Sequence, residues 1–106
     1  MRRINFNPEY VAPILSGSKR TTVRRGRRRY ERGEVVELTV NRRPFARAKV
    51  VWSMVKRISE LTDEDARRDG FLSREELLRV LRRIYGRMEE GEFVTIIAFE
   101  LLRPKP

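Results

Sequence analysis

The chain has 106 residues, of which 38% are charged, and its 25 basic residues outnumber 15 acidic ones to give a net charge of +10. This length suits one domain, residues 1–106, with a single modest core. Because cysteine and histidine are absent, disulfides, Cys/His zinc sites, cysteine nucleophiles and imidazole bases are excluded. No cofactor or metal ion is expected, and any chemistry must come from Lys, Thr, Ser, Tyr, Asp, Glu or Arg.

The excess of positive charge predicts a polyanionic partner, with RNA or DNA first, although an acidic protein also fits the composition. The sequence has no apolar run of about 20 residues, and its start, MRRINFNPEY, lacks the hydrophobic stretch of a signal peptide. We therefore expect a cytoplasmic protein that does not enter membranes. The absence of Gln, with only three Asn, is typical of thermophilic proteins. The oligomeric state is left open.

In chain order, the first elements are a short strand in RINFN (3–7) and a helix that starts at Asn7-Pro8 and runs toward Gly17. Pro13 predicts that this helix is kinked or begins later. The β-branched segments EVVELTV (34–40) and FARAKVVW (45–52) predict an antiparallel pair joined by a turn at NRRP.

The segment 72–86, LSREELLRVLRRIYG, carries the signals of a helix. Ser73 is the expected N-cap, Leu72 and Leu77 form an expected hydrophobic staple, and Gly86 follows the end. Leu77, Leu81 and Ile84 are its expected core stripe. A shorter capped turn starts at Thr62, with Asp65 three residues on, and ends near Gly70.

The last strand is expected in EFVTIIAFELL (92–102), buried on both sides over Val94 to Ala98. It would be a dimer edge only if it proved uncovered. The order of these elements, with helices inserted into a run of strands, favours an α+β fold built as a small mixed β-barrel.

Four segments follow one another from Tyr10 to Leu101: YVAPILSGSKRTTVRRG, YERGEVVEL, LTDEDARRDGFLSREELLRVL and FVTIIAFEL. Taken in this order, they resemble the ASCH domain (activating signal cointegrator homology), a relative of the PUA fold. The most specific element is a Gly-x-Lys-x-x-Thr-x-Arg string, followed much later by an aspartate-glycine pair before a helix. In this sequence these positions are Gly17, Lys19, Thr22, Arg24 and Asp69-Gly70.

The resemblance implies a PUA-like barrel of five or six strands with helices at its edge and a cleft that the string lines. It also implies RNA binding, and one branch of the family hydrolyses the acetyl amide of N4-acetylcytidine with a Thr nucleophile, a Lys base and a Glu proton donor. Carried over, Thr22 is the nucleophile and Lys19 the base. The acid position is Asp69, one methylene shorter than Glu.

Lys19 also stands out by its own chemistry, because only four of the 25 basic residues are lysines. Lys can lose its proton near neutral pH, and Arg20 and Arg24 would lower its pKa if it were partly buried. The alternative is an exposed loop lysine. As a nucleophile, Thr22 needs Lys19 close by, which a turn would allow and a strand would not. The alternative is a plain β-branched strand residue. The alternative for Asp69 is a residue that ends a helical turn, with Gly70 at positive φ.

The arginines after Lys19 predict contacts to phosphate, since a guanidinium binds phosphate through paired hydrogen bonds or stacks on a base. Tyr30, among these arginines, is the better base-stacking candidate, whereas Trp52 is expected in the core. We predict an RNA- or nucleotide-binding protein with a basic cleft, or alternatively an amidohydrolase for N4-acetylcytidine or a related acylated nucleoside. The predicted nucleic-acid-binding residues are Lys19, Arg20, Arg24, Arg25, Arg27, Arg28, Arg29 and Tyr30.

Overall fold

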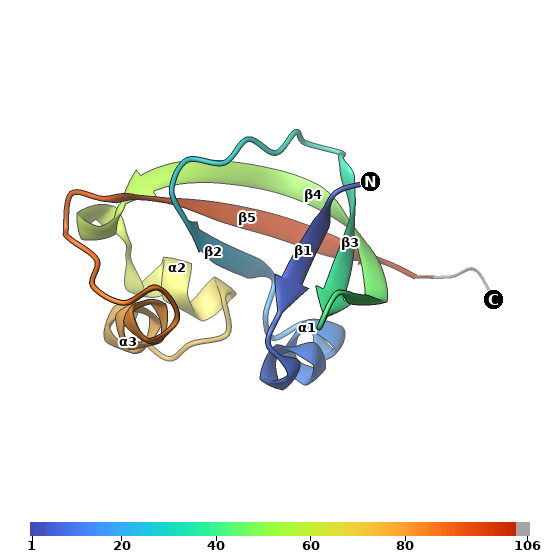
Figure 1. Cartoon of the computed structure of the whole chain (residues 1–106), viewed down its shortest axis with the longest axis horizontal. Helices are drawn as coiled ribbons and strands as arrows, with labels where there is room; N and C mark the ends of the chain where they lie inside the picture. The colour runs from blue at the N-terminus through green and yellow to red at the C-terminus, as the bar shows by residue number, and fades with distance from the viewer. Residues whose placement is uncertain (104–106) are drawn as a thin grey trace.

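Five strands form one sheet that curls into a half-barrel, with short helices at its edge (Figure 1). The computed structural model describes residues 1–103. The strand order is β1-β3-β4-β5-β2; β1 runs parallel to β3, and the other neighbours are antiparallel. The predicted α+β, PUA-like barrel of five or six strands is thereby confirmed, with five strands. The strands are β1 (Arg3–Phe6), β2 (Thr21–Arg25), β3 (Val35–Val40), β4 (Arg43–Arg57) and β5 (Phe93–Leu102).

The helices are short and gather at the open side of the curled sheet. Figure 1 shows α2 and α3 together below one end of the sheet and α1 below the other. No helix within residues 1–103 is long and apolar enough to cross a membrane. The helical elements are η1 (Pro8–Tyr10), α1 (Val11–Ser16), η2 (Ile58–Glu60), α2 (Asp63–Arg68) and α3 (Arg74–Tyr85).

The N-terminal helix begins later than Asn7, as one of the two alternatives for Pro13 required. Asn7-Pro8 starts only a 3₁₀ turn, and the α-helix proper begins at Val11. Pro13 therefore lies in the first turn of α1, where its missing N–H costs nothing. The helix ends at Gly17, whose φ of 88° permits the reversal toward Lys19.

The predicted hairpin at NRRP is confirmed in detail. Asn41 and Arg42 both have positive φ, 50° and 66°, which is the backbone of a two-residue type I′ turn. Val40 pairs with Arg43, and Pro44 enters the next strand opposite Thr39. That strand, β4, continues to Arg57, well beyond the predicted end at residue 52, and its register with β5 shifts between Val50 and Trp52.

The strand Thr21–Arg25 is absent from the expected order of elements. Its β-branched run, TTV, is short and lies within a segment so rich in basic residues that it gives only a weak strand signal. It pairs with β5, Thr21 opposite Ala98 and Arg25 opposite Val94. Since β5 lies between β4 and β2, both its edges are covered, and the condition for a dimer edge is not met. Burial of Val94 to Ala98 is confirmed.

Two apolar cores lie on opposite faces of the sheet. The inner face of the curl packs Phe6, Leu38, Val50 and Ile97, with Ile14 from α1. The other face packs against α2 and α3. Its residues are Val23, Ile58, Leu61, Ala66, Leu77, Leu78, Leu81, Met88, Val94 and Ile96.

Two predictions for the helix at 73–86 are wrong. Ile84 is 49% exposed, because it lines a pocket beside the core and is not packed inside the core. Leu72 is 81% exposed, and its predicted place against the core is taken by the preceding residue, Phe71. The N-cap prediction is confirmed, since the Ser73 hydroxyl accepts a hydrogen bond from the Glu76 N–H.

Candidate functional site

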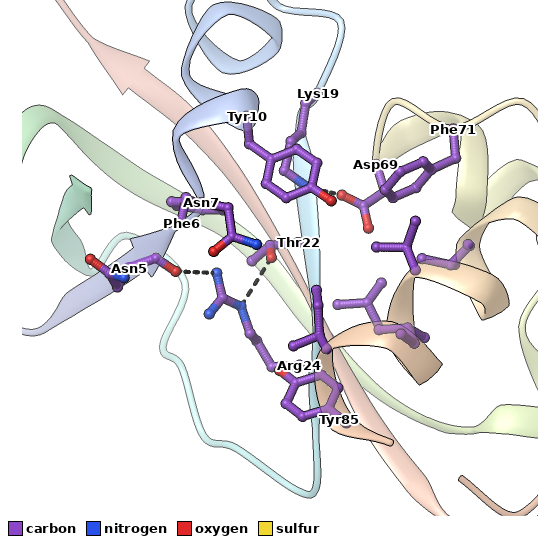
Figure 2. A pocket seen from close by; sticks show the side chains of 15 residues that line it. Asn5, Phe6, Asn7, Tyr10, Lys19, Thr22, Arg24, Asp69, Phe71 and Tyr85 are labelled. Atoms are coloured by element: carbon purple, nitrogen blue, oxygen red, sulfur yellow. Dashed lines mark hydrogen bonds and ion pairs between the residues drawn. The ribbon is translucent and has the colours of Figure 1, made fainter. Parts of the chain in front are cut away.

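A pocket opens where the two ends of the curled sheet meet, and we call it the seam pocket. The end strands β1 and β2 are joined there by Arg24, whose guanidinium donates to the Asn5 carbonyl at 2.9 Å and to the Thr22 hydroxyl at 3.0 Å. The wall opposite the strands comes from α3 and from the turn after α2 (Figure 2). The pocket's polar and aromatic lining residues are Asn5, Phe6, Asn7, Tyr10, Lys19, Thr22, Arg24, Asp69, Phe71 and Tyr85.

Lys19 and Asp69 form an ion pair inside this pocket, and each side chain is only 4% exposed. Asp69 is the C-cap of α2, and Gly70 follows with φ of 90°, so the predicted helix-ending role of this pair is correct. Gly70 also permits close approach, because a Cβ there would lie 3.4 Å from the Lys19 Cβ. The turn that ends α2 therefore presents its carboxylate directly to Lys19.

Three aromatic rings surround the ammonium group of Lys19. Its Nζ lies 5.0 Å from the ring centroid of Tyr10, 5.7 Å from that of Phe6 and 5.8 Å from that of Phe71. Tyr10 and Phe71 themselves meet edge to face, at 6.3 Å between centroids. Ring faces attract a cation at these distances, so the cage favours Lys19 charged while excluding water around it.

Burial shifts the proton equilibria of the pair in opposite directions. Desolvation raises the pKa of Asp69 to about 6, against the opposing effect of Lys19 and Arg24. Desolvation likewise lowers the pKa of Lys19, more than the neighbouring Asp69 raises it. Burial also lowers the pKa of Arg24. Burial therefore weakens the preference of both side chains for their charged forms and brings their pKa values closer together.

Thr22 and Lys19 both line the seam pocket, although Thr22 is a strand residue. The expectation that a strand would separate them assumed that both lay in it, whereas Lys19 precedes β2 and follows the reversal at Gly17. In residues 1–103 the Lys19 ammonium hydrogen-bonds to Asp69 and makes no hydrogen bond to Thr22. The Thr22 hydroxyl instead accepts from Arg24 (Figure 2).

Of the other predicted nucleic-acid-binding residues, Arg20 and Arg25 are held outside the seam pocket. Arg20 is exposed beside the first residue of β2, and its backbone N–H donates to the Arg68 carbonyl. Arg25 forms an ion pair with Glu92 at 2.7 Å. Neither side chain lines the pocket.

The loop that follows β2 carries the remaining predicted residues. Arg27 stacks on Phe93, at 4.0 Å from the ring centroid, and Arg29 faces Glu31 in an exposed ion pair. Arg28 is exposed, and its backbone N–H donates to the buried Thr95 hydroxyl, which fixes the loop to β5. Tyr30 is half-buried, and the guanidinium of Arg2 covers its ring at 3.8 Å.

Six of the polar and aromatic pocket residues were not predicted as site residues from the sequence: Asn5, Phe6, Asn7, Tyr10, Phe71 and Tyr85. Tyr10 is the first residue of the first ASCH-like segment, YVAPILSGSKRTTVRRG, and Phe71 follows the aspartate-glycine pair directly. The cage of Phe6, Tyr10 and Phe71 around Lys19 follows only from the contact between two segments about fifty residues apart in the chain. Within the described chain no group of three or more acidic, His or Cys side chains is placed to hold a metal ion.

The half-barrel, its helices at the open edge and the pocket at its seam define a PUA-like α+β domain. The chain belongs to the ASCH domain family, whose sequence pattern matches residues 2–103. No curated protein sequence matches it.

Solved structures show the same fold at low identity. A hypothetical protein is similar with a TM-score of 0.73 at 21% identity, over 96% of this chain and 100% of that one. The ASCH domain from Lactobacillus crispatus gives 0.65 at 15% identity, over 94% and 79%. The ASCH protein from Zymomonas mobilis gives 0.66 at 20% identity, over 92% and 65%.

Proposed function

We propose that this protein binds RNA or a nucleotide, with a base or an end group held in the seam pocket. The observation that carries the proposal is the seam pocket itself, where Lys19, Thr22 and Arg24 offer hydrogen bonds among aromatic rings. Its volume of about 100 Å³ is below the roughly 300–1,000 Å³ of sites for drug-sized ligands. A single ring or a small end group is therefore the appropriate occupant, with the rest of the ligand outside.

The arginine loop, residues 24–32, supports binding of the phosphate backbone beside the pocket. Arg27, Arg28 and Arg29 are exposed on it, and this segment starts in β2 at Arg24, the residue that closes the seam, and continues into the loop after the strand. Exposed arginines neutralise phosphates and release counterions, which gives affinity without sequence preference. The seam pocket would thus select a base or an end group, and the arginine loop would hold the phosphate backbone of the RNA strand.

The test is a titration with a short single-stranded RNA at several salt concentrations. Replacing Arg27, Arg28 and Arg29 together by Gln should reduce the slope of log K against log salt by about 2, since each contact to a single strand contributes about 0.7. Lys19→Met should weaken binding at every salt concentration with little change in slope, because Lys19 is already paired with Asp69. Affinity of the unaltered protein that ignores salt would disprove the role of the loop.

A second candidate is amide hydrolysis of N4-acetylcytidine or a related acylated nucleoside, and one observation favours it. Lys19 and Asp69 have pKa values shifted toward each other in the pocket that also holds the Thr22 hydroxyl. Thr22 would attack the acyl carbon and pass its proton to neutral Lys19, and Asp69 would protonate the departing amine. Water would then hydrolyse the acyl ester on Thr22 and release the acid. Arg24 would stabilise the negative charge that develops on the acyl oxygen.

Acetate release from N4-acetylcytidine separates the two candidates. If the protein is a hydrolase, Thr22→Val abolishes release while Thr22→Ser retains part of it, because serine keeps the hydroxyl. Binding of N4-acetylcytidine without release, unchanged in Thr22→Val, would leave only the binding function. Wild-type protein, assayed with N4-acetylcytidine at the same elevated temperature, is the control for both Thr22 variants.

A further inference from the structure

A second hollow lies on the opposite face of β2 from the seam pocket. Successive strand residues point to opposite faces, so Thr22 lines the seam pocket while Thr21 lines this other hollow. Its volume is about 310 Å³, which is within the range of small-molecule sites. We call it the Trp52 groove, and its main lining residues are Arg20, Thr21, Trp52, Arg68, Ala98 and Glu100.

The sheet builds this groove from one row of residues across three strands. Ala98 of β5 pairs with Thr21 on one side and with Trp52 of β4 on the other, so all three side chains point to the same face. The bulge between Val50 and Trp52 is what brings the indole into this row. The middle residue is small, so a hollow remains between the hydroxyl and the ring.

The floor of the groove contains an unsatisfied polar atom. Thr21 is 1% exposed, and its hydroxyl oxygen is the buried side-chain polar atom that lacks a hydrogen-bond partner within residues 1–103. Such an atom costs free energy in a folded protein unless something else satisfies it. Valine would fill the same volume without that cost, so the position invites a ligand that supplies the missing partner.

Two arginines stand at the rim of the groove. Arg20 is exposed and forms no ion pair in the part of the chain that the structure describes. Arg68 has only long ion-pair contacts, 3.6 Å to Glu64 and 3.7 Å to Asp65. The backbone hydrogen bond of 2.8 Å from Arg20 to Arg68 keeps their chain positions adjacent. Glu100, also at the rim, adds an acceptor for a hydroxyl or amino group.

We propose that the Trp52 groove is a second binding site, for a nucleotide whose base lies against Trp52 and whose phosphate is held by Arg20 and Arg68. An aromatic ring accepts any base through its π face, and guanidinium groups bind phosphate by charge-assisted hydrogen bonds. Glu100 makes inorganic phosphate alone a poor ligand, because it repels a dianion that offers it no hydroxyl or amino donor. The nucleotide is either free or part of an RNA strand.

Trp52 is the only tryptophan of the protein, so its fluorescence reports on this groove. We would titrate adenosine 5′-monophosphate, a short oligoadenylate, adenosine and inorganic phosphate while following Trp52 emission. Quenching by the monophosphate, weak quenching by adenosine and none by phosphate are expected. Quenching by the oligoadenylate alone would also support the site and would identify RNA as the source of the nucleotide.

Variants assign the signal to the groove. Arg20→Gln should raise the dissociation constant about tenfold, the effect of losing one charge-assisted hydrogen bond. Thr21→Val should weaken binding and also raise the melting temperature by several degrees, because it removes the unsatisfied hydroxyl. The two shifts together distinguish a ligand contact from a structural role.

Lys19→Met and Arg47→Gln are the matched controls, one in the seam pocket and one on the exposed surface of β4, and neither should alter the quenching by adenosine 5′-monophosphate. If no nucleotide quenches Trp52, or if Arg20→Gln has no effect, the proposal is wrong. Quenching lost in Lys19→Met would also overturn it, because the signal would then come from the seam pocket. Loss of RNA binding in Lys19→Met with Trp52 quenching intact would keep the two proposals separate.

Discussion

The Lys19–Asp69 pair and the Arg29–Glu31 pair join the same kinds of charge in opposite surroundings. The first pair is 4% exposed on both sides, whereas the side chains of the second are 90% and 70% exposed. Water screens the exposed charges, so such a pair contributes only about 0–1 kcal/mol, whereas the buried charges depend on each other. A functional site is therefore expected where charged side chains are buried despite the cost of desolvation. The many surface arginines act together, through the positive electrostatic potential that they create.

The largest effect is expected from removing one partner of the buried pair. Asp69→Ala leaves the Lys19 ammonium buried without its carboxylate, and we expect a loss of about 3–5 kcal/mol in the free energy of unfolding. Urea titration at pH 7 measures it, with Glu31→Ala as the exposed counterpart, expected within about 0.5 kcal/mol of wild type. Equal effects of the two substitutions would remove the distinction between the pairs.

The pH dependence of stability sharpens the same comparison. The pKa of Asp69 is raised to about 6 from 3.8, so the folded state favours the protonated acid. The corresponding stabilisation is complete below pH 3.8 and is lost as the pH rises through 6, by an amount on the order of 3 kcal/mol. Lys19, with a lowered pKa, adds stability at alkaline pH that is lost as the pH falls through its folded value.

Unfolding free energies of wild type and Asp69→Asn between pH 4 and 7 isolate this contribution, because other carboxyl groups titrate alike in both proteins. The difference, wild type minus variant, should decrease as the pH rises. A difference that increases over this range would mean that Lys19 lowers the pKa of Asp69 more than burial raises it.

A smaller effect is expected at the seam. Arg24→Lys keeps the charge but cannot reach both the Thr22 hydroxyl and the Asn5 carbonyl, because an ammonium lacks the planar fork. We expect a loss of about 1.5–3 kcal/mol by thermal unfolding, the range for hydrogen bonds to charged groups. Arg27→Lys, which keeps its cation near Phe93, is the control. Similar losses in both variants would show that Arg24 does not join the two ends of the sheet.

The smallest effect is expected on the arginine loop. Arg29→Gln removes an exposed charge from a pair that water already screens, so its stability should stay within about 0.5 kcal/mol of wild type. Differential scanning calorimetry is sufficient to check it. A large loss would assign the arginine loop a role in the fold and weaken its proposed role in binding phosphate.

Much of this fold was readable from local signals. The β-branched runs, the Asn41-Arg42 turn and the Ser73 cap each rest on neighbouring residues, and all are confirmed. A strand at Thr21–Arg25 was only the alternative interpretation of Thr22, because basic residues flank the short run TTV and its burial comes from the distant partner β5. Ile84 was misplaced because helical periodicity does not show where the core ends. Lys19, Thr22 and Asp69 were found through the family string, and their catalytic and binding roles stay predictions. The aromatic cage needed the three-dimensional contact between distant segments.

The position of β5 in the sheet has a consequence for how the protein is made. Thr21 pairs with Ala98, so β2 has no strand partner until β5, more than seventy residues later in the sequence, has left the ribosome. Until then the basic strand and the residues of the seam pocket are exposed to the ribosome's own RNA, which attracts positive charge. Sheet closure thus depends on a strand pairing distant in sequence, a kind of contact that forms slowly, and the Thr22–Arg24 side of the pocket depends on that pairing.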